Sequence, residues 1–141
     1  MTTLLHLSDT HFGTEVRPVA QALKRLAREE GVNALVLSGD ITQRATRRQF
    51  MAAREYVQAL AVPHILALPG NHDISLWCPW QRLMRPHSLY QEFFPTPFDR
   101  HGLTSLVCPD VTVIGVNTTR PHRQGLRSEE RRVGKECRSR W

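Results

Sequence analysis

The stretch LPGNHD, Leu68–Asp73, lies where an apolar run ends and three polar side chains follow one another. Glycine and asparagine both tolerate turn conformations, and asparagine side chains fold back onto nearby backbone, so the stretch alone predicts only a turn. Its meaning depends on the apolar runs that precede it. In a parallel sheet the carboxyl ends of neighbouring strands meet at one edge, and binding sites of such folds lie there.

Three short apolar runs alternate with two amphipathic segments. Strands are expected at residues 3–7, 34–38 and 64–68. The first is apolar on both faces, which predicts cover on both sides and a core or near-core position for His6. The intervening segments predict helices, with Pro18 in the first turn of one and Thr46 at the start of the other. Their buried faces are expected to be Val19, Leu23, Leu26 and Ala27, and Phe50, Ala53, Val57 and Leu60.

This alternation predicts an α/β fold with a mostly parallel sheet and right-handed crossovers. Further along, LTSLVCPDVTVIGVN (residues 103–117) predicts two more strands that turn at Pro109 and Asp110 and add to the same sheet. The length suits one domain.

Bulk features favour a cytoplasmic protein without a membrane segment. No apolar run approaches the length of a membrane span, and Met1 leads directly into strand-like sequence without a leader. The three cysteines, Cys78, Cys108 and Cys137, lack CxxC spacing, so neither a disulfide framework nor a zinc ribbon is predicted.

The segment RSEERRVGKECRSRW (residues 127–141) differs from the rest of the chain. It holds six basic and three acidic residues, half of the net charge of +6, and has no apolar periodicity. It also resembles the in-frame translation of a common sequencing adapter. We therefore expect a non-native read-through tail at residues 127–141 and a natural protein that continues beyond residue 126, the alternative being a natural basic tail.

Each of the three predicted strands ends in side chains of the kind that bind metals. Asp9 and His11 follow the first strand, Asp40 follows the second, and the third is followed by Asn71, His72 and Asp73. Residues two apart in extended chain point the same way, so Asp9 and His11 can address one ion together. Each residue alone is explained as a helix cap or turn residue, but together they predict a metal site at one sheet edge.

The order D-x-H, G-D, G-N-H-D resembles the calcineurin-like metallophosphoesterase superfamily, and VIGVNTTRP (residues 113–121) is similar to its class III cyclic-nucleotide phosphodiesterase branch. The resemblance implies residues 1–126 as the N-terminal half of an α/β/β/α sandwich. It implies that Asp9 and His11 bind one metal ion, that Asp40 bridges two, and that Asn71 binds the second. Asn71 and His72 would contact substrate, with His72 catalytic.

The chain departs from the superfamily pattern in one important respect. No G-H-x-H is present, and His87, His101 and His122 are expected to be surface or loop residues instead. Gln43 also stands where the superfamily has Asp or Asn, which weakens a supporting role for that side chain. The two metal shells would be incomplete, so we expect the 141-residue chain to be inactive and poorly stable.

The implied activity is hydrolysis of a small phosphodiester or phosphomonoester, with a cyclic nucleotide among the candidates, through two divalent ions (Mn, Fe, Zn or Co) and a bridging hydroxide. One alternative is a nuclease in which Arg44, Arg47 and Arg48 contact a nucleic-acid backbone; a solvated helix face explains them better, so we do not expect such a partner. Another is a non-catalytic interaction module. Trp77 and Trp80 are expected at the rim of the site or as hydrophobic cover, and the sequence leaves the oligomeric state open.

Overall fold

The computed structural model describes residues 1–74 and 84–119. Trp77, Trp80, Cys78, His122, Cys137 and the predicted tail lie outside these residues. Three five-residue strands, β1 (Leu4–Ser8), β2 (Ala34–Ser38) and β3 (His64–Leu68), form a parallel sheet in the order β1-β2-β3. They pair without a register shift, from Leu4 beside Ala34 beside His64 to Ser8 beside Ser38 beside Leu68. The predicted α/β fold with a parallel sheet is therefore confirmed.

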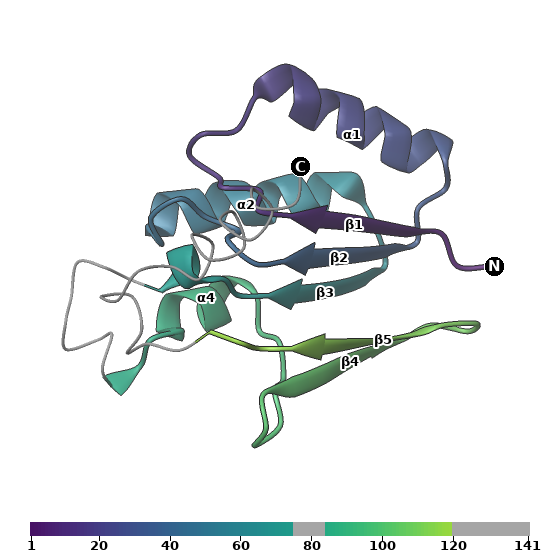
Figure 1. Ribbon diagram of the computed structural model, residues 1–141. Helices are drawn as coiled ribbons and strands as arrows, with labels where there is room; N and C mark the ends of the chain where they lie inside the picture. Colours follow the sequence, from purple (N-terminus) through teal and green to yellow (C-terminus); the bar gives the residue numbers. More distant parts are fainter. Residues whose placement is uncertain (75–83, 120–141) are drawn as a thin grey trace, which may run out of the picture.

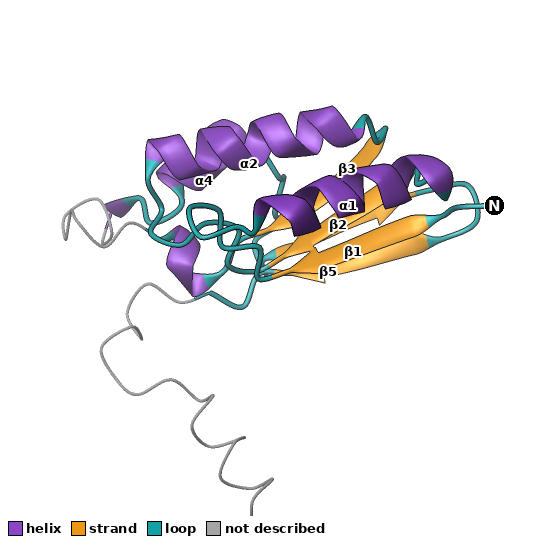
Figure 2. Cartoon of the chain, turned by 90° about the horizontal axis from the view of Figure 1, so that it is seen from above, coloured by secondary structure: helices purple, strands orange, loops and turns teal. Residues whose placement is uncertain are grey.

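Two helices cross between these strands and lie over the same face of the sheet (Figures 1 and 2). They are α1 (Arg17–Glu29) and α2 (Arg47–Leu60). As predicted, Pro18 lies in the first turn of α1 and the Thr46 side chain caps α2 by accepting a hydrogen bond from the Gln49 amide. A short helix, α4 (Ser88–Phe93), lies beside α2 and completes that layer.

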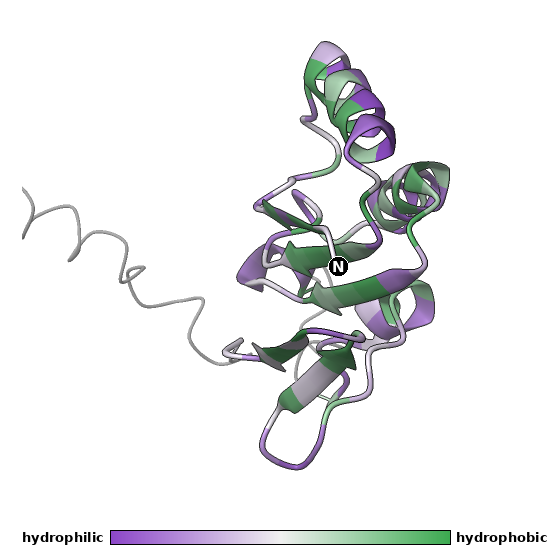
Figure 3. Ribbon diagram, turned by 90° about the vertical axis from the view of Figure 1, so that its right-hand side faces the viewer, coloured by the Kyte–Doolittle hydropathy of each residue, from purple (hydrophilic) through white to green (hydrophobic). Residues whose placement is uncertain are grey.

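The core lies between the helices and the face of the sheet that they cover. All four predicted residues of α2 are buried, and Phe50 contacts the rings of Tyr90 and Phe93 from the α4 region. Leu35 and Leu37 of β2 are the best buried strand residues of this face. The strands of the sheet carry mostly apolar residues (Figure 3).

The first strand differs from its prediction. In β1, exposed residues alternate with half-buried ones: Leu5 and Leu7 pack toward the core, whereas Leu4, His6 and Ser8 are exposed. Burial of β1 on both faces and a core position for His6 are therefore wrong. The reason is that a second, two-stranded sheet packs against β3 at the other end of this sheet and leaves the His6 face of β1 in water. The His6 ring contacts the Ser38 hydroxyl of β2, at 2.6 Å.

The last two strands, β4 (Leu103–Val107) and β5 (Thr112–Val116), form a separate antiparallel sheet, so the prediction that they extend the first sheet is wrong. The outer edge of β3 is already occupied, because the Ala67 carbonyl accepts hydrogen bonds from the Tyr90 and Thr96 hydroxyls. This explains why the two strands do not pair with β3. The hairpin lies next to β3 (Figure 1), so close that a Cβ on Gly115 would lie 2.7 Å from Leu68 Cδ2. This second sheet is consistent with the first half of an α/β/β/α sandwich.

Candidate functional site

The polar residues that follow β1 and β2 are brought together as predicted. One potential ligand atom from each of Asp9, His11 and Asp40 lies within 4.8 Å of the other two. Two carboxylates at this separation repel each other unless positive charge lies between them. Oxygen and imidazole donors are a ligand set that suits divalent transition metals.

The backbone holds these three residues in an unusual conformation. Asp9, His11 and Asp40 all have positive φ, at 52°, 42° and 39°. Left-handed backbone is sterically unfavourable for residues with a Cβ, and such residues cluster at functional sites. The strands therefore do not simply run on into helices; each ends in a sharp bend at a residue with a potential ligand side chain.

The two bends are joined by backbone hydrogen bonds. The His11 amide donates to the Asp40 carbonyl at 3.0 Å, and the Phe12 amide donates to the Ile41 carbonyl at 2.8 Å. Phe12 and Thr42 then form a parallel bridge beyond the sheet. Pairing on both sides of the bends thus keeps the loop after β1 beside the loop after β2.

The loop after β3 forms a single 3-10 turn, η1 (Asn71–Asp73), directly behind the sheet edge. The His72 amide donates to Asp40 Oδ1 at 2.9 Å, so the loop after β3 contacts the Asp40 side chain of the loop after β2. A Cβ on Gly70 would lie 2.0 Å from the Asp40 amide nitrogen, and only glycine permits this approach. Asn71 is exposed at the start of η1, and its role as a ligand stays a prediction.

His72 is oriented by a backbone carbonyl. Its Nδ1 lies 2.8 Å from the Gln43 carbonyl oxygen, which can only accept, so Nδ1 carries a hydrogen and Nε2 is left to act elsewhere. The ring also meets the His11 ring edge to face, with centroids 5.0 Å apart. Gln43 therefore orients His72 through its main-chain carbonyl, and this contact does not depend on which side chain stands at position 43.

Sequence reasoning placed Asp73 among the potential metal ligands after β3 but gave it no role of its own. This residue is only 1% exposed, and burial raises the pKa of its carboxyl group, while hydrogen bonds from Gly70, Ile41 and Thr42 oppose that rise. Its position three residues after Gly70, where an aspartate can accept the Gly70 amide, was the available signal.

Two of the later histidines lie among the described residues. His101 is exposed, as expected. His87 is half-buried against Tyr90, and its Nε2 lies 3.1 Å from the Thr119 hydroxyl, so it is not a free surface residue. Burial lowers the pKa of His87.

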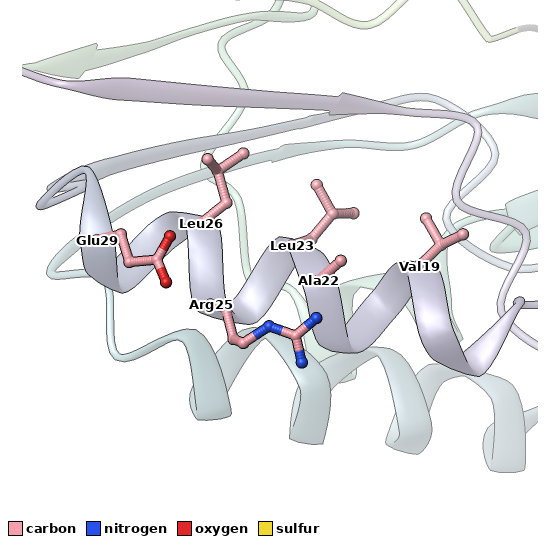
Figure 4. Close-up of a pocket in the computed structure, with 6 residues that line it drawn as sticks. All are labelled: Val19, Ala22, Leu23, Arg25, Leu26 and Glu29. Carbon is pink, nitrogen blue, oxygen red and sulfur yellow. The ribbon is translucent and has the colours of Figure 1, made fainter.

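The fit of a metal ion can be judged from His11. Within the described part of the chain its Nδ1 is buried and has no hydrogen-bond partner. A buried imidazole nitrogen without a partner is destabilising, and a cation beside it together with two carboxylates removes that penalty. The residues present therefore fit a divalent ion. A surface hollow of about 420 Å³ along α1 is lined mainly by apolar residues and is not part of this site (Figure 4).

No helix in residues 1–74 and 84–119 combines the length and apolarity needed to cross a bilayer.

Comparison with known proteins gives two findings. The chain is similar to a glycerophosphodiester phosphodiesterase, GpdQ, of Enterobacter lignolyticus (strain SCF1), with 33% identity over 81 residues, covering 50% of this chain and 29% of the relative. The matched part thus spans less than a third of the relative's length. The model of the calcineurin-like phosphoesterase family matches residues 2–130, which include the strands, the bends and η1 as well as the first four residues of the predicted tail. Since this match covers most of the chain, the chain belongs to the calcineurin-like phosphoesterase family.

Proposed function

We propose that this chain supplies the first half of the metal site of a phosphoesterase that hydrolyses a phosphodiester or phosphomonoester. The observation that carries the proposal is the meeting of Asp9, His11 and Asp40 within 4.8 Å at the carboxyl edge of the sheet. In this proposal Asp9 and His11 bind one ion, Asp40 bridges two, and Asn71 binds the second. When bound, divalent ions supply Lewis-acid activation of water and neutralise charge on phosphoryl oxygens.

His72 is the proposed catalytic residue and, with Asn71, contacts the substrate. The hydrogen bond from Nδ1 to the Gln43 carbonyl keeps the ring in one orientation and leaves Nε2 to address a phosphoryl or leaving-group oxygen. When the ring is protonated, Nε2 donates a charge-assisted hydrogen bond to that oxygen. Contact of the His72 amide with Asp40 keeps this ring beside the metal ligands.

The proposed substrate class rests on the name of the relative GpdQ. Its name describes a phosphodiesterase that acts on glycerophosphodiesters. We therefore favour a small phosphodiester for the complete protein and retain a cyclic nucleotide and a phosphomonoester as alternatives. The proposed protein is cytoplasmic and uses Mn, Fe, Zn or Co.

A nuclease on the same scaffold is less well supported. Arg47 forms an ion pair with Glu92 at 2.5 Å and lies over the Phe93 ring, so this arginine already has intramolecular partners. A steep salt dependence of DNA binding would favour the nuclease. A non-catalytic module would lack metal affinity, which the following experiment measures.

Metal binding is tested by titrating the purified 141-residue chain with Mn²⁺ in a calorimeter. Asp40→Asn is expected to weaken Mn²⁺ binding by about 100-fold, because it removes a charged ligand. The matched control is Glu55→Gln, which removes the same charge from an exposed position on α2 and should bind as the wild type does. Equal affinity in wild type and Asp40→Asn would contradict the proposal.

Phosphoester recognition is tested by adding inorganic phosphate to the Mn²⁺-loaded chain. Phosphate should bind only when Mn²⁺ is present, and His72→Gln should weaken it by about tenfold through loss of a charge-assisted hydrogen bond. Because the sequence has no G-H-x-H, hydrolysis of bis(4-nitrophenyl) phosphate by this chain should stay near background. Fast metal-dependent hydrolysis would show that the later histidines are not needed.

A further inference from the structure

Asp73 has a full set of hydrogen bonds although it is buried. Oδ2 accepts from the Ile41 and Gly70 amides, both at 2.9 Å. Oδ1 accepts from the Thr42 amide at 2.7 Å and from the Thr42 hydroxyl at 2.8 Å. A carboxylate has about four acceptor sites, so all of them are used. Asp73 therefore has no acceptor site left for a metal ion or a proton-transfer role.

The four donors lie on the two loops that carry the proposed ligands. Ile41 follows Asp40 directly, and Gly70 directly precedes Asn71 and His72. One carboxylate thus joins the residue after one ligand to the residue before the next. The hydrogen bond from the His72 amide to Asp40 Oδ1 is a second connection between the same loops.

We infer that Asp73 is a positioning residue that sets the separation between the loop carrying Asp40 and the loop carrying Asn71 and His72. This inference rests on the proposed function, because it assigns the two loops to one metal site. It goes further because it gives Asp73, the last residue of the G-N-H-D sequence, a role other than metal binding. Asp73 acts through other residues and does not contact the metal ion or substrate.

Tyr90 provides a matched comparison with a purely structural group. It is fully buried, and its hydroxyl donates to the Ala67 carbonyl and contacts Thr96, so it joins β3 to the α4 region. None of these partners is a proposed ligand or a neighbour of one. Tyr90→Phe therefore removes a buried hydrogen bond that is not one of the bonds joining the two loops.

The experiment compares Asp73→Asn, Thr42→Val and Tyr90→Phe by Mn²⁺ titration of the full chain. Asp73→Asn places an amide donor against backbone donors and should weaken Mn²⁺ binding by about tenfold or more. Thr42→Val removes one of the four bonds to Asp73, together with the bond that the Thr42 hydroxyl accepts from the Ala45 amide, and should weaken Mn²⁺ binding less, in the same direction. Tyr90→Phe should lower stability and leave Mn²⁺ affinity unchanged. Unchanged affinity in both Asp73→Asn and Thr42→Val would overturn the inference.

Amide hydrogen exchange without metal separates this inference from the proposed function. In Asp73→Asn, the amides of Ile41, Thr42 and Gly70 should exchange faster, while those of Leu35 and Leu37 in β2 stay as in the wild type. If wild type binds no Mn²⁺, the proposed function fails while exchange still tests the connection between the loops. If those three amides keep their protection, the positioning role is wrong. Should Asp73→Asn fail to fold, Thr42→Val decides both measurements.

Discussion

The two long helices cover the same face of the sheet but are held very differently. Five residues of α2 are buried, whereas only Ala27 of α1 is. In α1 the predicted apolar face remains accessible: Val19 is 56% and Leu26 43% exposed, and both line the hollow along the helix (Figure 4). Thr46 caps α2, while Val16 offers α1 no side-chain cap.

This contrast divides the candidate site between a firmly packed and a loosely packed half. Asp40, Asn71 and His72 follow β2 and β3, the strands on either side of α2 in the chain, whereas Asp9 and His11 follow the edge strand β1 and lead into α1. Backbone pairing of His11 and Phe12 with Asp40 and Ile41 is one connection between the halves, and the hydrogen bond from the Tyr56 hydroxyl to the Ala20 carbonyl is another. An ion bound by Asp9, His11 and Asp40 would add a further connection, so metal binding should stabilise the α1 half most.

The largest expected effect comes from truncating one apolar side chain in each helix. Phe50→Ala in α2 should lower the free energy of unfolding by about 3 to 5 kcal/mol, because it leaves a cavity in the core. Leu26→Ala in α1 should lower it by less than about 1 kcal/mol, since 43% of that residue's surface is already exposed to water. Urea denaturation measures both, and similar losses would show that α1 is packed as firmly as α2.

Glycine substitutions compare the two halves at the backbone. Gly70→Ala should cost about 1 to 3 kcal/mol and impair Mn²⁺ binding, because its Cβ would overlap the Asp40 backbone. Gly31→Ala, after α1, meets no atom within 4 Å and should cost about 1 kcal/mol through its φ of +59° alone. Urea denaturation measures both stability costs, and Mn²⁺ titration of the folded variants distinguishes the two. Normal metal affinity in Gly70→Ala would mean that the two loops can separate without loss of Mn²⁺ binding.

Helix caps give a smaller effect of opposite sign in the two helices. Thr46→Ala should destabilise by about 1 kcal/mol, because the Gln49 amide loses its acceptor. Val16→Asp should stabilise by about 0.5 kcal/mol, because Val16 has extended backbone suited to an N-cap residue. Thermal melting of both variants measures the difference, and a loss of stability in Val16→Asp would show that α1 does not begin as described.

The smallest expected effect is a dependence of stability on pH through His87. Burial lowers its pKa in the folded state below the ordinary 6.5, so the unfolded state binds the proton more readily. Its contribution to stability is full above pH 6.5 and is lost as pH falls from there through the folded pKa. His87→Gln should therefore flatten the change in unfolding free energy between pH 8 and pH 5, whereas the exposed His101→Gln should leave it unchanged.

The parts of the site that were predictable from sequence depend on local rules. Parallel strands in register bring their carboxyl ends together, so the convergence of Asp9, His11 and Asp40 followed from the order of elements alone. The Thr46 cap and the buried face of α2 were predictable because each depends on residues only three or four positions apart in the sequence.

The missed features depend on contacts between distant segments. The burial of α1 and β1 depends on which other segments of the protein pack against them. An amphipathic pattern does not identify those segments. Hydrogen bonds from Tyr90 and Thr96 to Ala67 close the edge of β3 and exclude β4 and β5 from the first sheet. The role of Asp73 required knowledge that Ile41 and Thr42 lie beside it.

The left-handed backbone at Asp9, His11 and Asp40 has a consequence for how this protein can be engineered. Each such residue with a Cβ costs roughly 1 kcal/mol or more compared with glycine. Replacement of all three by glycine should therefore relieve backbone strain while it removes every potential ligand of the group. A search for more stable variants that ignored activity would select against this site first, so thermostability screens of this fold need a metal-binding counter-screen.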